Sequence, residues 1–234
     1  PMEVGIFGFK GGKKFWGGIG QTIADAIKLL VKEDIIPKDA DRFLMILAPF
    51  IIFIGAFVTF IGVPFSDGLI ISDFNIGILY VIAMSSVGVI GIILAGWSSN
   101  NKWSLYGAMR AAAQIISYEI PIGLSLILVV IVVGSLEMSE IVKWQADNRW
   151  FIIHSPFAML GFFIFFISGV AETNRVPFDI PEAESELVAG WMTEYSGFRW
   201  ALFFLSEYTN MLIVCIIASV VFLGGWLSPF KIIN

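Results

Sequence analysis

The chain of 234 residues is poor in charge: 14% of its residues are Asp, Glu, Lys or Arg, whereas 58% are hydrophobic. Soluble domains carry roughly 25% charged residues. This composition therefore excludes a soluble globular protein and indicates an integral membrane protein. The formal net charge of -5 also excludes a nucleic-acid-binding protein, because no excess of basic residues is available to neutralise phosphates.

Cysteine and histidine are almost absent, with one of each in the chain. Cys215 alone cannot form an intrachain disulfide or supply the several thiolates of an iron–sulfur or zinc site, and we interpret it as a small core residue. His154 alone leaves few possible metal sites, and we give it no role. We therefore expect no metal and no redox centre on this chain, so any electron carrier belongs to a partner.

Long apolar runs make up most of the chain. Five of them are long enough to cross roughly 30 Å of hydrocarbon at 1.5 Å per helical residue. Tryptophans mark several of their ends, as in an interfacial aromatic belt. The predicted fold class is an all-α integral membrane protein with about five transmembrane helices. The predicted spans are residues 43–63, 78–97, 111–134, 152–170 and 200–226.

The basic residues gather on one side of these spans. Residues 1–42, 98–110 and 171–199 hold eleven of the 14 Lys and Arg residues, so the positive-inside rule places them in the cytoplasm or its equivalent. No internal repeat supports an inverted-repeat transporter. We divide the chain into an N-terminal segment (1–42), four spans (43–170), an acidic loop (171–199) and a fifth span with its tail (200–234).

A short amphipathic helix is predicted before the first span, after a glycine-rich loop over residues 1–18. Its apolar residues recur at helical spacing, but at about 14 residues it is too short for a span, which needs about 20. It lies in the membrane interface or, equally well, packs on the surface of its own protein. The apolar positions are Ile19, Ile23, Ala26, Ile27 and Leu30.

The loop between the last two apolar runs concentrates acid: from Val170 to Gly197 it holds six carboxylates and one base, Arg175. Charge beside hydrocarbon costs several kcal/mol per group unless it is paired, hydrated or neutralised. Crowded carboxylates titrate together, with some pKa values raised, which favours proton uptake and relay. The alternative is a solvated helix from Pro181, whose acids complement the helix dipole. The acids are Glu172, Asp179, Glu182, Glu184, Glu186 and Glu194.

Two more carboxylates fall inside predicted spans. Glu119 precedes Pro121, whose missing N–H weakens the helix and frees a carbonyl group. Glu207 lies near the start of the fifth span. Because intramembrane acids are functional by default, Glu119 and Glu207 are candidate functional residues. The alternative for each is a protonated side chain that hydrogen-bonds a neighbouring helix.

At these residues the sequence resembles a known family. AETNRVPFDIPEAESELVAG (171–190), the TEYSG that follows shortly after it, and ALFFLSEYTNM (201–211) are similar to the membrane subunit at the quinone site of proton-pumping NADH:quinone oxidoreductase. This enzyme is respiratory complex I, and the family comprises its bacterial H subunits and their mitochondrial counterparts, called subunit 1. IADAIKLLVKED (23–34), ADRFLMILAP (40–49), GWSSNNKWSLYGAMRAAAQIISYEIP (96–121) and FLGGW (222–226) extend the match over most of the chain.

The resemblance implies a subunit of an enzyme complex that forms the membrane part of a quinone chamber and begins a proton path. Quinone would be the substrate, with iron–sulfur clusters and FMN on partner subunits. The implied partners are hydrophilic subunits that roof the chamber and antiporter-like membrane subunits, in a bacterial cytoplasmic membrane rather than the mitochondrial inner membrane. The implied entrance residues are Asp25, Ala26 and Lys28. The implied chamber and proton-coupling residues are Glu119, Glu172, Arg175, Asp179, Glu182, Glu184, Glu186, Glu194 and Glu207.

Several alternatives remain open. A ferredoxin-fed photosynthetic-type complex and a membrane-bound hydrogenase use the same module with other electron donors, although the Asn174-Arg175 form of the loop favours the respiratory type. A stand-alone ion transporter and a scaffold are alternatives of other classes. The KGGKKFWGGIG segment (10–20) departs from the family pattern near the entrance. The family's first span and last two spans have no counterpart here, so we expect a fragment.

Overall fold

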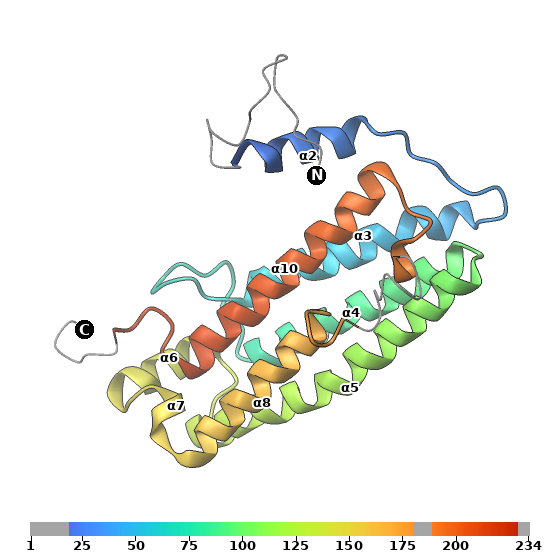
Figure 1. The fold of residues 1–234 in the computed structure, drawn as a ribbon. Helices are drawn as coiled ribbons and strands as arrows, with labels where there is room; N and C mark the ends of the chain where they lie inside the picture. The colour runs from blue at the N-terminus through green and yellow to red at the C-terminus, as the bar shows by residue number, and fades with distance from the viewer. Residues whose placement is uncertain (1–18, 180–188, 229–234) are drawn as a thin grey trace.

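The computed structural model describes residues 19–179 and 189–228, and within these ranges every regular element is a helix. An isolated bridge between Ser66 and Leu69 is the one strand-like pairing recorded there. Figure 1 shows long helices lying side by side in a bundle, with a short helix, α2, across one end. The all-α membrane fold predicted from the sequence is confirmed.

Four helices are long and apolar enough to cross a membrane, and they coincide with four of the five predicted spans. Two of them start at a polar residue that satisfies free backbone N–H groups: Asp41 accepts bonds from the N–H groups of Phe43 and Leu44, and Asn101 accepts one from Trp103. The four are α3 (Arg42–Thr59, continued by the 3-10 turn η2, Phe60–Gly62), α4 (Gly77–Ser98), α5 (Lys102–Val133) and α10 (Gly197–Phe222).

The third of these helices is longer than the predicted span. Asn101 caps α5 through a hydrogen bond from the Trp103 N–H, so the helix begins nine residues before the expected position 111. The polar residues 102–110 lower the hydropathy without interrupting the helix. Its 32 residues correspond to about 48 Å, so α5 extends beyond the apolar layer at its N-terminal end.

The fourth predicted span, residues 152–170, is interrupted at Ser155. There the chain leaves α7 (Phe151–His154) and enters α8 (Pro156–Glu172). Pro156 has no N–H to continue the preceding helix and is well tolerated in the first turn of a new one, while the Ser155 hydroxyl accepts a bond from the Ala158 N–H. The 17 residues of α8 reach about 26 Å.

The connecting segments meet at the two ends of the bundle as the charge count predicts. At one end the Asp41 N–H bonds the carbonyl oxygen of Ser98, and the Asn101 amide bonds Glu194. At the other end Gln145 of α6 (Met138–Asp147) donates to the carbonyl oxygen of Val220. The described parts of the three segments that hold most of the Lys and Arg residues therefore meet at the first end.

Two apolar clusters hold the bundle together. One lies toward the second end and includes Phe165 of α8 and Phe222 of α10, whose ring centroids are 5.4 Å apart. The other lies toward the first end, where Trp191 of the short turn η3 (Gly190–Met192) and Tyr195 both pack on the ring of Phe203. The second cluster supports the return of the acidic loop to the bundle.

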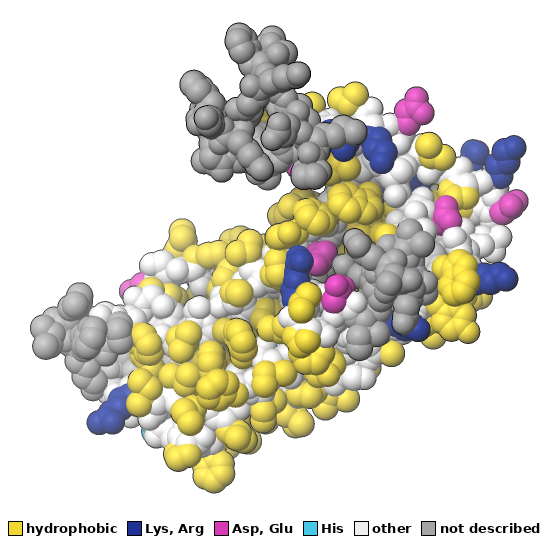
Figure 2. Space-filling model, in the orientation of Figure 1, with side chains coloured by type: hydrophobic (Ala, Val, Ile, Leu, Met, Phe, Trp, Pro, Cys, Tyr) yellow, Lys and Arg dark blue, Asp and Glu magenta, His cyan; other side chains and the backbone are white. Residues whose placement is uncertain are grey.

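Much of the helix surface is apolar and exposed, as lipid contact requires. Ile131 is 74% exposed and Phe157 is 75% exposed, values that are unusual for such side chains in a water-soluble protein. Figure 2 shows apolar side chains along the helices, whereas most of the charged side chains in that view lie toward α2 and the neighbouring ends of α3 and α5. This distribution places the charged end at a membrane boundary.

The amphipathic helix predicted over residues 19–32 is present as α2 (Ile19–Val31). It contacts α10 and lies beyond the N-terminal end of that helix rather than among the spans (Figure 1). Ile23, Ile27 and Leu30 are each more than half exposed. Their apolar face is therefore not covered by the described part of the chain, which favours the interfacial position over packing on its own protein.

Candidate functional site

The start of the acidic loop is attached to α5 by one amide side chain. Nε2 of Gln114 lies 2.8 Å from the carbonyl oxygens of both Ala171 and Phe178, and 3.0 Å from Oδ1 of Asn174. Asn174 has a φ of 51°, a left-handed conformation that asparagine adopts more readily than most residues. These contacts fold residues 171–178 back against α5.

An ion pair joins this part of the loop to α10. Nη2 of Arg175 lies 2.9 Å from Oε1 of Glu207. The guanidinium also lies over the ring of Tyr208, 5.0 Å from its centroid, and Nε is 3.2 Å from Sδ of Met211. The single base of the loop is thus oriented by three side chains on α10, and the intramembrane acid Glu207 has a cationic partner.

A small cavity between α4, α5, α8 and α10 contains the other two acids. Its volume is about 30 Å³. Glu119, Glu172, Ser85 and Asn210 are its polar lining residues, and the other lining residues are apolar. Ser86 also donates a hydrogen bond to Oε1 of Glu119. A cavity of this size holds one or two water molecules when polar groups line it. The arrangement can therefore carry a proton between two carboxyl groups on different helices.

Glu194 lies apart from this cavity. Its Oε1 accepts a hydrogen bond of 2.6 Å from Nδ2 of Asn101, at the turn between α4 and α5. The neighbouring Tyr195 is buried and its hydroxyl lies 3.1 Å from Oγ of Ser98. Burial raises the pKa of Tyr195, although the Ser98 hydrogen bond and the charge of Arg199 oppose the shift. In this region, hydrogen bonds donated by uncharged side chains hold the loop against the bundle.

The structure thus groups some of the predicted residues and separates others. Glu119 faces Glu172, and Arg175 pairs with Glu207, whereas Glu194 is held at the α4–α5 turn. The serine bond to Glu119 is also what the alternative of a hydrogen-bonded acid requires. Asp179 is exposed, and so are Asp25, Ala26 and Lys28 on α2. Glu182, Glu184 and Glu186 lie outside the described residues, so the helix proposed from Pro181 stays a prediction.

Sequence reasoning did not identify the uncharged polar residues of the site, and it placed Cys215 incorrectly. Gln114 and Asn210 are polar residues inside otherwise apolar helices, and this signal could have identified them. The interpretation of Cys215 as a core residue is wrong: it is exposed beside Pro64 and Trp226, because it faces outward from α10. No group of three potential metal ligands occurs within residues 19–179 and 189–228.

The fold and the site together define a polytopic α-helical membrane protein in which loop residues 171–178 contact Gln114 of α5 and Glu207 of α10. The chain belongs to the NADH dehydrogenase family, because the family model of that description matches residues 4–233. The resemblance noted in the sequence is thereby confirmed at the level of the family.

Curated relatives are similar over nearly the whole chain. The H subunit of NADH-quinone oxidoreductase from Chlorobaculum parvum is 51% identical over 233 residues, which cover 98% of this chain and 62% of the relative. The proteins of the same name from Bacteroides thetaiotaomicron and Dehalococcoides mccartyi are 54% and 53% identical, over 94% and 97% of this chain and 61% and 63% of those relatives. The chain therefore spans about three fifths of the length of the curated relatives that it matches.

Proposed function

We propose that this chain is part of the membrane-embedded H subunit of a NADH:quinone oxidoreductase, forming the membrane side of the quinone chamber and the start of its proton path. The relatives that carry this name support the assignment. The observation that carries the proton-path role is the cavity shared by Glu119 and Glu172, next to the ion pair of Arg175 with Glu207.

The chemistry follows from the charges. Reduction of a quinone to a quinol consumes two electrons and two protons, so negative charge develops at the chamber before protons arrive. Nearby carboxyl groups respond because their ionisation states are coupled. Arg175 can stay with Glu207 or respond to charge in the chamber, and the Glu119–Glu172 cavity can pass a proton deeper into the bundle. The coupling between the sites is a free energy shared by their charge states.

Helix α2 forms the entrance for the quinone. Ile23, Ile27 and Leu30 present an apolar surface at the membrane boundary, while Asp25 and Lys28 are exposed on the same helix. A lipid-soluble quinone can approach along such a surface and meet charged groups only at the chamber, which suits a site with an apolar opening and a few polar groups.

The other components belong to partners. We infer that iron–sulfur clusters and FMN are carried by hydrophilic subunits that roof the chamber, and that antiporter-like subunits continue the proton path in the membrane. A bacterial cytoplasmic membrane suits the bacterial relatives. A complex with another electron donor would keep the same acids, so identification of the co-purifying subunits separates these alternatives.

The test uses Glu207→Gln in the assembled complex with the full-length subunit, and measures quinone reduction and proton pumping in proteoliposomes. The matched control is Glu140→Gln, an exposed acid of α6 at the opposite end of the bundle. The proposal expects pumping to fall in the first variant and not in the second. Unchanged pumping and reduction in Glu207→Gln would contradict it, and ion transport by the purified chain alone would favour the transporter alternative.

A further inference from the structure

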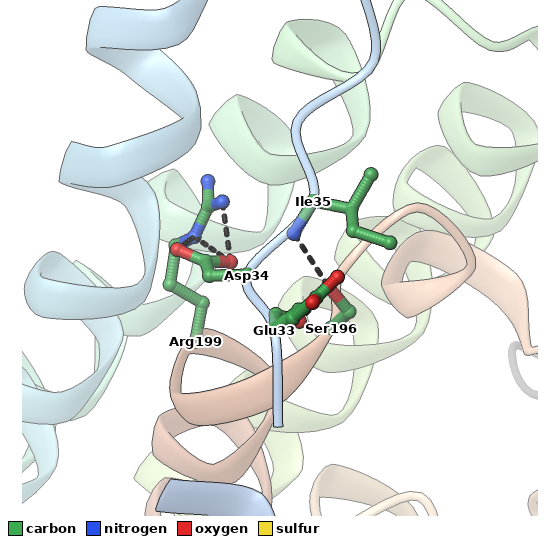
Figure 3. A network of polar contacts seen from close by, with 5 residues as sticks. All are labelled: Glu33, Asp34, Ile35, Ser196 and Arg199. Carbon is green, nitrogen blue, oxygen red and sulfur yellow. Dashed lines mark hydrogen bonds and ion pairs between the residues drawn. The ribbon is translucent and has the colours of Figure 1, made fainter. Parts of the chain in front are cut away.

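The segment that follows α2 is fixed to the start of α10 by an ion pair that the proton path does not use. Nε of Arg199 lies 2.8 Å from each carboxylate oxygen of Asp34, and Nη2 bonds the same carboxylate. Figure 3 shows the guanidinium of Arg199 beside the Asp34 carboxylate, between α3 and the chain that leads away from α2. Arginine and carboxylate in this arrangement fix both distance and orientation.

Backbone contacts next to the ion pair hold the same segment. The Ile35 N–H donates to Oγ of Ser196 at 3.1 Å, and that hydroxyl lies 3.4 Å from the carbonyl oxygen of Glu33 (Figure 3). Gly197 has a φ of 59°, and a Cβ at this position would lie 3.0 Å from the Lys32 carbonyl oxygen. The left-handed glycine lets the two backbones approach closely. We call Asp34, Ser196, Gly197 and Arg199 the clamp.

The two charges of the clamp differ in exposure. The side chain of Arg199 is 5% exposed, whereas that of Asp34 is 47% exposed. Nη1 of Arg199 is buried with no hydrogen-bond acceptor among the residues that the structure describes. Because a buried charge is costly without a partner, Asp34 is the group that compensates this guanidinium. The ion pair therefore binds the segment more specifically than a surface salt bridge would.

The clamp connects two parts of the proposed site. It begins three residues after α2, which we assign to the quinone entrance, and it ends on α10, which carries Glu207 two turns further along. We propose that Asp34 and Arg199 are positioning residues: they hold α2 in one place against α10 and so keep the quinone entrance in its binding-competent position. This inference rests on the proposed function.

The expected effect is on apparent quinone affinity. If α2 occupies its productive position only part of the time, the apparent dissociation constant rises by the inverse of that fraction. Loss of the clamp should therefore raise the KM for quinone by about threefold to tenfold and leave kcat within about twofold. The rise should be larger for a long-tailed quinone supplied in the bilayer than for a short-chain ubiquinone or menaquinone analogue.

The variants separate positioning from loss of stability. Asp34→Asn leaves a buried guanidinium uncompensated, so it can also impair assembly. Asp34→Asn combined with Arg199→Met removes both charges and still lacks the clamp. Asp34→Glu keeps the charge and should restore much of the wild-type KM. Asp39→Asn is the matched control, because it removes an exposed acid from the same linker.

A distance measurement supplies a readout that does not depend on turnover. Spin labels are placed at Val31 on α2 and Leu212 on α10, both exposed positions outside the proposed entrance surface. They are introduced as a genetically encoded amino acid in the assembled complex, so that Cys215 and the cysteines of partner subunits stay unlabelled. The double variant should broaden the distance distribution and raise the KM, whereas Asp39→Asn should do neither. An assembled double variant with the wild-type distribution overturns the clamp. A broadened distribution with an unchanged KM overturns the link between the clamp and the quinone entrance, but leaves the proton-path proposal intact. The proton-path proposal is contradicted by a different result, namely unchanged pumping in Glu207→Gln.

Discussion

Glu119 of α5 and Glu172 of α8 line the same cavity, and they are its two charged residues among the described side chains that surround it. Two carboxyl groups across a space for one or two waters are arranged as the proposed proton path requires, provided that polar groups keep water in a cavity whose other lining residues are apolar. Its remaining polar lining comes from Ser85 and Asn210. The contribution of that lining can be tested without changing either acid.

Asn210→Leu should slow pumping by about tenfold or more, because an apolar lining excludes the water that a proton transfer needs. Quinone reduction measured with an uncoupler should change much less. The measurement is the pumping rate per quinone reduced in proteoliposomes. Asn148→Leu, at an exposed position at the other end of the bundle, is the control, and equal pumping in the two variants would remove the cavity from the path.

The Arg175–Glu207 ion pair should contribute little to stability. The side chain of Arg175 is 39% exposed and that of Glu207 is 17% exposed, so the pair is only partly removed from polar surroundings. A double-mutant cycle of Arg175→Gln and Glu207→Gln should give a coupling energy of about 0.5–1 kcal/mol. Thermal denaturation of the assembled complex measures it. A much larger value would mean that the pair is structural, and its effect on pumping would then need a separate explanation.

Gly107→Ala should displace the end of the loop from α5. A Cβ at Gly107 would lie 2.7 Å from the backbone of Gly190 and Trp191, so η3 would have to move, at a cost of about 1–3 kcal/mol. Gly123→Ala on the same helix is a close control, because no atom of another described residue lies within 4 Å of its added Cβ and alanine favours a helix by about 1 kcal/mol. The two variants should therefore shift the denaturation temperature in opposite directions, and equal shifts would contradict the close packing.

Stability should fall at alkaline pH because of Tyr195. Burial raises the pKa of its hydroxyl above the ordinary value of 10.0, so the folded state binds the proton more tightly than the unfolded state. Its contribution is complete below pH 10 and is lost as the pH rises through the folded-state pKa. Tyr195→Phe should remove this part of the pH dependence while losing the Ser98 hydrogen bond. Identical alkaline denaturation profiles would show that Tyr195 does not ionise with unfolding.

The helices and the acids could be predicted from sequence because hydropathy and helical periodicity are local properties. The spans near α3, α4 and α10, the amphipathic helix α2 and the intramembrane acids Glu119 and Glu207 all follow from such patterns. The start of α5 was missed because its first turns are polar, and the interruption at Ser155 was missed because hydropathy does not register a proline.

The pairing of side chains could not be predicted in the same way. Gln114 bonds residues about sixty positions later in the chain, and Asp34 meets Arg199 across most of it. Such contacts depend on helix rotation and packing, which are set by long-range contacts rather than by local pattern. The outward position of Cys215 could not be predicted for the same reason, because it depends on the rotation of α10.

The most direct test of the proton-path role is redox-triggered infrared difference spectroscopy on the assembled complex, recorded as the quinone is reduced. Our account predicts a carboxyl band that changes on reduction and is lost in Glu119→Gln or Glu172→Gln but retained in Glu140→Gln. A difference spectrum that is the same in all of these variants would contradict it, because the cavity acids would then not respond to the state of the quinone.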